Sequence, residues 1–120
     1  MSLIARHLES LGIPTLCLAS ALDIIEAGHP PRAVFVDYPL GHTAGKPFDS
    51  SDQLNVIRQA LSAFETIDSP GALVTLSNQW SDDEKWREQA NTADGGDSRQ
   101  PRDTRPVYQH EADRVLAEGL

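Results

Sequence analysis

Along the first two thirds of the chain, segments with an apolar residue every three or four positions alternate with short, continuous apolar runs. The spaced pattern predicts amphipathic helices, and the continuous runs predict strands buried on both faces of a sheet. Helices are therefore predicted at residues 2–11, 21–27 and 51–67, and strands at residues 13–19, 33–38 and 72–76. Ser20, and Ser50 or Ser51, are the expected N-caps of the second and third helices.

The third helix has the strongest pattern and is expected to pack on the sheet. Its apolar stripe recurs at intervals of three and four residues, and further apolar positions widen it. The stripe consists of Leu54, Ile57, Leu61 and Phe64, widened by Val56, Ala60 and Ile67. If this face is buried, replacing Leu61 and Phe64 by Ala costs several kcal/mol in total. A shorter stripe of Ile4, Leu8 and Leu11 marks the first helix.

The order of these elements predicts the fold class. Helices alternating with strands imply parallel strands joined by right-handed crossovers. The expected fold is α/β, a small three-layer sandwich with a short, mainly parallel sheet and flanking helices, plus a C-terminal helical tail. Three strands leave exposed sheet edges. A homo-oligomer, a partner subunit or missing sequence is therefore expected to complete the sheet.

The composition of the sequence changes after Trp80. Residues 1–80 are predicted to form the α/β domain, and the acidic start at Ser81 predicts a short helix over 81–90. Residues 91–106 contain no aliphatic side chain larger than Ala, so they are predicted to be a flexible linker. A C-terminal helix is expected over 107–120.

Composition removes several function classes. The chain has 18 acidic and 10 basic residues, a net charge of −8, which argues against a nucleic-acid partner. No apolar run approaches the roughly 18 to 20 residues of a membrane span, and no signal peptide is evident, so a cytoplasmic protein is expected. The single cysteine, Cys17, excludes an intrachain disulfide and lies in a predicted strand, where a thiol usually packs as a small hydrophobe. Neither a cofactor nor a metal site is predicted.

The richest chemistry lies in the loop after the second strand. Ligands of open parallel sheets bind beyond the carboxyl ends of the strands. Here those ends lead into Ser20, residues 37–49 and residues 77–80, which are expected to converge. The predicted ligand-binding residues are Asp37, Tyr38, Pro39, Leu40, Gly41, His42, Gly45 and Lys46. Asp37 and His42 are the catalytic candidates, although Asp37 equally suits a loop-capping role and a lone loop histidine is commonly solvent-exposed.

Two stretches carry a family resemblance. They are Gly12-Ile13-Pro14-Thr15, and the segment from Asp37-Tyr38-Pro39-Leu40-Gly41 to Gly45-Lys46-Pro47-Phe48-Asp49, supported by Pro31-Arg32, Gln53, Trp80 and Trp86. Together they resemble the C-terminal part of the selenoprotein B component of glycine, sarcosine, betaine and D-proline reductases, and its uncharacterised Cys-containing relatives. The resemblance covers roughly residues 2 to 90. It implies reduction by a thiol or selenol, within a multi-subunit assembly, of a substrate activated at a carbonyl.

The chain departs from that family at its redox centre. In the family the reactive selenocysteine or cysteine lies in a Cys-x-x-Cys-like motif, whereas this chain has only Cys17, which is not assigned as a nucleophile. One hypothesis is therefore a reductase-like oxidoreductase component, or a fragment of one, that is inactive as an isolated chain and binds a small-molecule substrate. A partner subunit or missing sequence would then complete the pocket and supply a redox Cys. The other is a noncatalytic α/β small-molecule-binding or assembly module.

Overall fold

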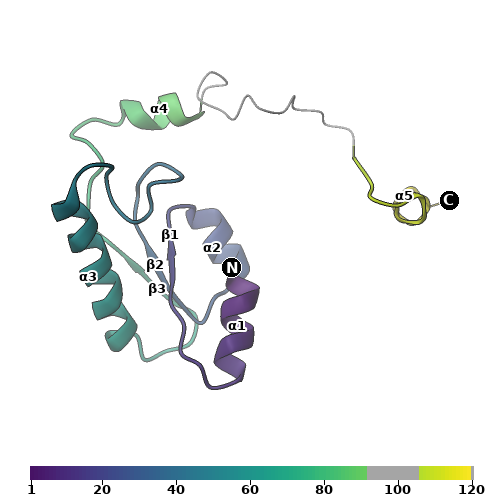
Figure 1. Ribbon diagram of the computed structural model, residues 1–120, viewed down its shortest axis with the longest axis horizontal. Coiled ribbons are helices and arrows are strands. Elements are labelled where there is room, and N and C mark those ends of the chain that lie inside the picture. The colour runs from purple at the N-terminus through teal and green to yellow at the C-terminus, as the bar shows by residue number, and fades with distance from the viewer. Residues whose placement is uncertain (92–105, 120) are drawn as a thin grey trace.

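A three-stranded parallel sheet forms the centre of the computed structural model, which describes residues 1–91 and 106–119 (Figure 1). The strands are β1 (Cys17–Ala19), β2 (Arg32–Phe35) and β3 (Ala72–Thr75), in the spatial order β1-β2-β3. Cys17 lies opposite Ala33, which in turn lies opposite Leu73. The second predicted strand is therefore the central one, although each strand is shorter than its apolar run.

Helices cover both faces of the sheet. On one face lie α1 (Ser2–Ser10) and α2 (Leu22–Gly28), and on the other lies α3 (Ser50–Thr66) (Figure 1). Side chains along each strand alternate between the two layers. In β2, Ala33 packs with α1 and α2, whereas the next residue, Val34, packs with α3. This arrangement confirms the predicted small α/β sandwich.

The two crossovers have opposite hands. In a sheet ordered β1-β2-β3, both connections are right-handed only when their helices lie on the same face. Because α2 and α3 pack on opposite faces, one connection is left-handed. The expectation of right-handed crossovers throughout is therefore wrong for one of them.

The core is divided by the sheet into a larger and a smaller cluster. The larger one, on the α3 side, consists of Val34, Val36, Tyr38, Val56, Ala63, Ile67 and Leu76. The smaller one, on the α1 and α2 side, consists of Ala5, Cys17, Ile25 and Ala33. Fully buried side chains belong to the α3 side, namely Val34, Val36 and Val56. Most of the hydrophobic stabilisation therefore comes from packing α3 on the sheet.

The buried faces of the helices differ from the predicted stripes. In α3 the residues that face the sheet are Val56, Ala60 and Ala63, followed by Ile67 at the C-cap. Leu54, Ile57 and Leu61 are exposed, with 61% of Leu61 accessible to solvent, and Phe64 is half-buried. In α1 only Ala5 is buried, while Ile4 and Leu11 are exposed. The positions predicted to widen the stripe, Val56, Ala60 and Ile67, are therefore buried, whereas the predicted centre of the stripe at Leu54, Ile57 and Leu61 is not.

Two predicted helix caps are also wrong. The N-cap of α2 is Ala21, which has no side-chain cap, because the Ser20 hydroxyl forms a hydrogen bond with Thr43 instead. The N-cap of α3 is Asp49, whose carboxylate accepts a hydrogen bond from the Asp52 backbone N–H at 3.0 Å. A carboxylate at this position also favours the positive end of the helix dipole.

Beyond the sandwich the structure has α4 (Lys85–Asn91) and α5 (Glu111–Ala117). The first begins inside the segment predicted as a short helix, residues 81–90, and extends one residue beyond it, and the second lies within the predicted C-terminal helix. Residues 92–105, most of the predicted linker, lie outside the described residues. Neither described segment contains a helix with both the length and the apolarity that a membrane crossing requires.

The α3 packing predicts unequal effects of two truncations. Val56→Ala removes a fully buried side chain, so we expect the free energy of unfolding to fall by about 2 kcal/mol. Leu61→Ala removes an exposed side chain, so the expected loss is under about 0.5 kcal/mol. Urea denaturation followed by circular dichroism measures both values. Equal losses for the two variants would contradict the observed orientation of α3.

Candidate functional site

The three loops at the carboxyl ends of the strands meet, as the sequence predicts. Ser20, after β1, forms a 2.8 Å hydrogen bond with Thr43 of the long loop after β2. Within that loop, His42 stacks on Trp80, which follows β3, with ring centroids 5.2 Å apart. Tyr38 meets the same indole edge-on at 5.3 Å. This edge of the sheet is therefore a continuous surface made by all three loops.

A shared carboxylate fixes the long loop to α3. Asp52, in the first turn of that helix, accepts a 2.8 Å hydrogen bond from the Tyr38 hydroxyl. Its other oxygen accepts a 2.9 Å hydrogen bond from the Lys46 backbone N–H. The Lys46 carbonyl accepts in turn from the Gln53 side-chain amide at 2.7 Å. The two ends of the loop are thus joined to one helical turn.

These contacts shift the pKa values of the two partners in opposite directions. Burial, followed by the hydrogen bond and the negative charge of Asp52, raises the pKa of Tyr38 to about 12. Burial alone would raise the pKa of Asp52, but hydrogen bonds from Lys46 and Tyr38 and the charge of Lys46 outweigh it and lower that pKa. Around neutral pH the pair is therefore a neutral phenol donating to a carboxylate.

Gly45 has a steric role in this loop. Its φ angle is +122°, and a Cβ atom placed on it would lie 2.6 Å from the Gln53 Cα atom. Glycine is thus required for the loop to approach the backbone of α3. This requirement explains one of the two loop glycines that the sequence marks as ligand-binding, since Gly41 faces open space.

Asp37 lines a polar pocket rather than capping its own loop. Its carboxylate pairs with the Arg87 guanidinium of α4, which also pairs with Glu84. The pocket has a volume of about 130 Å³ and is lined by Asp37, Asn78, Gln79, Trp80, Ser81, Asp82, Glu84, Trp86 and Arg87. It contains opposite charges next to two indoles. Such a surface can bind a small polar molecule that carries both an acid and a base.

The structure places the predicted ligand-binding residues in different surroundings. Asp37 lines the polar pocket, and Tyr38 and His42 pack against Trp80 behind it. The Lys46 ammonium lies 6.0 Å from the centre of the Tyr38 ring. Leu40 is 74% exposed, and Pro39 and Gly41 complete the turn beside it. The loop is therefore one unit, but only Asp37 enters the pocket.

Sequence reasoning missed Asp52 and Arg87 as site residues. Asp52 is 14 positions from Tyr38, and Arg87 is 50 positions from Asp37. Asn78, which lines the pocket, exchanges hydrogen bonds with Gln59 and Asn55 of α3. The acidic residues beside the loop were the available signal for Asp52, whereas no local pattern indicates Arg87.

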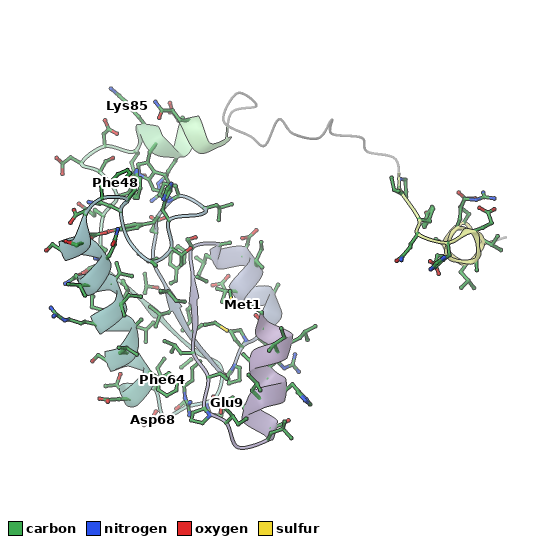
Figure 2. All side chains as sticks on the ribbon, viewed as in Figure 1. Met1, Glu9, Phe48, Phe64, Asp68 and Lys85 are labelled. Atoms are coloured by element: carbon green, nitrogen blue, oxygen red, sulfur yellow. The ribbon has the colours of Figure 1, made fainter. Side chains whose placement is uncertain are left out.

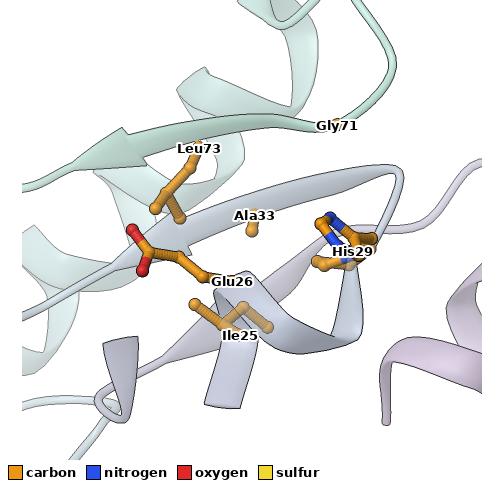
Figure 3. Close-up of a pocket in the computed structure, with 7 residues that line it drawn as sticks. Ile25, Glu26, His29, Ala33, Gly71 and Leu73 are labelled. Carbon is orange, nitrogen blue, oxygen red and sulfur yellow. The ribbon is translucent and has the colours of Figure 1, made fainter. Parts of the chain in front are cut away.

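A larger hollow lies at the opposite end of the sheet. It measures about 270 Å³, and Figure 3 shows Ile25 and Glu26 of α2, His29 after it, and Ala33 and Leu73 from two neighbouring strands around it. Its floor is apolar, and its titratable groups are Glu26 and His29. Because ligands of parallel sheets bind at the carboxyl ends of the strands, the smaller polar pocket is the better candidate site.

Cys17 belongs to the core. The side chain is 3% exposed and packs with Ala5, Ile25 and Ala33. Burial raises the pKa of the thiol, with a smaller opposing effect from the N-terminal charge. Thiolate formation is therefore disfavoured, which confirms the prediction that this cysteine packs as a hydrophobe. Among the described residues, no group of three or more His, Cys, Asp or Glu side chains is placed to hold a metal ion.

The Tyr38–Asp52 hydrogen bond predicts a pH dependence of stability. The unfolded phenol ionises near pH 10 and the folded one at about pH 12. The folded-state pKa is the higher one, so this contribution is complete below about pH 10 and is lost as pH rises through about 12. We expect Tyr38→Phe to reduce the loss of stability over that interval, measured by urea unfolding. Tyr108→Phe is the control, and an identical pH slope for Tyr38→Phe and wild type would contradict the assignment.

No protein-family model and no solved structure matches the chain. A curated relative does: over 78 residues the chain is 30% identical to the D-proline reductase subunit gamma of Acetoanaerobium sticklandii. The match covers 65% of this chain and 32% of the relative, so the chain spans about a third of the length of that subunit. This similarity relates the chain to a reductase subunit, as the resemblance read from the loop and strand motifs implies.

Proposed function

We propose that this chain is a reductase component that binds a small zwitterionic substrate at the carboxyl edge of its sheet and receives its redox thiols from another polypeptide. In this proposal it corresponds to the C-terminal lobe of the selenoprotein B type of reductase component. Two facts support the proposal. The chain is similar to a D-proline reductase subunit, and the carboxyl-edge pocket contains paired opposite charges.

The observation that carries the proposal is the pairing of Asp37 and Arg87 in a pocket of about 130 Å³. A molecule with an ammonium and a carboxylate group can replace the ion pair between these two side chains. Its ammonium group then binds Asp37, and its carboxylate binds Arg87. At about 30 Å³ per water, the pocket has the volume of about four waters, enough for one small amino acid. Trp80 and Trp86 supply apolar walls. D-Proline is the natural first ligand to test.

The chemistry of thiols explains why, in this proposal, the redox group lies outside these 120 residues. A two-electron reduction of substrate by thiols oxidises two of them to one disulfide. This chain has one cysteine, which is buried in the α1 and α2 layer with a raised pKa. We therefore assign substrate binding to this chain and the reducing dithiol, or a selenol with a thiol, to its partner.

The alternative is a noncatalytic α/β small-molecule-binding or assembly module. The same buried cysteine and the open sheet edges favour it. Native mass spectrometry of the endogenous protein distinguishes the two. A complex with a polypeptide carrying reactive Cys or selenocysteine supports the reductase component, and a lone 13.1 kDa monomer or homodimer supports the module.

Ligand binding by the isolated chain tests the proposed site directly. We expect D-proline to produce saturable shifts of the Trp80 and Trp86 indole N–H signals in a two-dimensional NMR titration. Arg87→Gln removes the cation that binds the carboxylate of D-proline, so it should weaken D-proline binding about tenfold or more. Arg58→Gln, the same change of charge on the exposed surface of α3, is the matched control.

A ligand whose amine is acetylated provides a second control. N-acetyl-D-proline lacks the ammonium group, so it should bind the wild-type protein more weakly than D-proline does. To Asp37→Asn, which lacks the carboxylate, the two ligands should bind with equally weak affinity. Absence of saturable shifts with D-proline, or equal effects of the two arginine substitutions, would refute the proposed site.

A further inference from the structure

Phe48 is a fully exposed aromatic residue held in a disfavoured backbone conformation. Its exposed fraction is 106%, the highest of the large hydrophobic side chains described, and its φ angle is +60°. Residues with a Cβ atom rarely adopt this left-handed region, and a bulky residue there is a genuine outlier. The side chain makes no contribution to either core cluster. Folding of the chain therefore gives no reason for an aromatic residue here.

The backbone on both sides of Phe48 is fixed. Two residues before it, Lys46 donates its N–H to Asp52 at 2.9 Å and accepts from Gln53 at 2.7 Å. Directly after it, Asp49 caps α3. Strained residues persist where the surroundings determine their conformation, and they concentrate at functional positions. The chain thus presents Phe48 outward from a rigid support.

We propose that Phe48, together with exposed Leu40 of the same loop, anchors the thiol-bearing subunit at the carboxyl edge of the sheet. Aromatic side chains on a rigid support are typical anchors of protein interfaces, because they bury much area with little loss of side-chain freedom. Figure 2 shows Phe48 at the same end of the molecule as Lys85, where α4 begins. The anchor thus lies at the edge that contains the Asp37 pocket.

The charge of this edge favours a different polypeptide over a second copy. The exposed residues Asp82, Asp83 and Glu84 lie beside the pocket, and the whole chain has a net charge of −8. Two copies meeting by this edge would place acidic residues against acidic residues, which is unfavourable. We therefore assign a partner with a basic contact face and an apolar recess for Phe48. This identification of the partner as the thiol-bearing subunit rests on the proposed function.

Site-specific photo-crosslinking in the source cells tests the anchor. Phe48→p-benzoylphenylalanine is compared with Leu11→p-benzoylphenylalanine, because Leu11 is 63% exposed and follows Glu9, which Figure 2 shows at the opposite end of the molecule. We expect irradiation to link position 48, and not position 11, to a polypeptide that mass spectrometry identifies and whose Cys or selenocysteine reacts with a thiol reagent. Adducts with a second copy, with a polypeptide lacking a reactive thiol, or equally from both positions would overturn the inference.

A folding control separates loss of the anchor from loss of the fold. Phe48→Gly relieves the left-handed strain and removes no buried contact, so its Tm should equal or exceed that of the wild type. The same variant should lose the partner in native mass spectrometry and keep its D-proline titration. Absence of D-proline binding by the wild-type chain would refute the proposed site alone. Retention of the partner by Phe48→Gly would refute the anchor alone.

Discussion

The carboxylate of Asp52 is the interaction on which the carboxyl edge depends. It accepts from the Tyr38 hydroxyl and from the Lys46 backbone, so two distant parts of the loop at residues 37–49 meet at one helical turn. The Tyr38 ring is then held edge-on against Trp80, and the His42 ring stacks on the same indole. Without the carboxylate, a nearly buried phenol would lose its acceptor, which costs more than an exposed hydrogen bond would.

The sequence pattern was sufficient for the order and type of the elements but not for the orientation of α3. Two stripes on that helix recur at three and four positions, one of Leu54, Ile57 and Leu61 and the other of Val56, Ala60 and Ala63. Hydrophobicity favours the first, whereas the sheet receives the second. Small side chains allow the helix to lie close to the strands, and that requirement depends on the opposing surface, which no single stripe reveals.

Only part of the candidate site could likewise be predicted from the sequence. Convergence of the three loops follows from the parallel topology, so it could be predicted. The identity of the contacts could not, because Ser20 uses its hydroxyl on Thr43 instead of on its own helix, and Asp37 finds its cation 50 positions away. Local rules for caps and turns describe neighbours in sequence. Tertiary partners compete for the same polar atoms and prevail here.

Cys17 gives the fold a built-in reporter. The thiol lies opposite Ala33 in the register of the sheet and beneath α1 and α2, so a reagent reaches it only when that layer opens. It is the single thiol in the chain, and its labelling rate in the native protein therefore measures how often the smaller core separates from the strands. The larger core on the α3 side can remain closed during that event. The kinetics of one side chain thus distinguish local opening of one layer from unfolding of the whole sandwich.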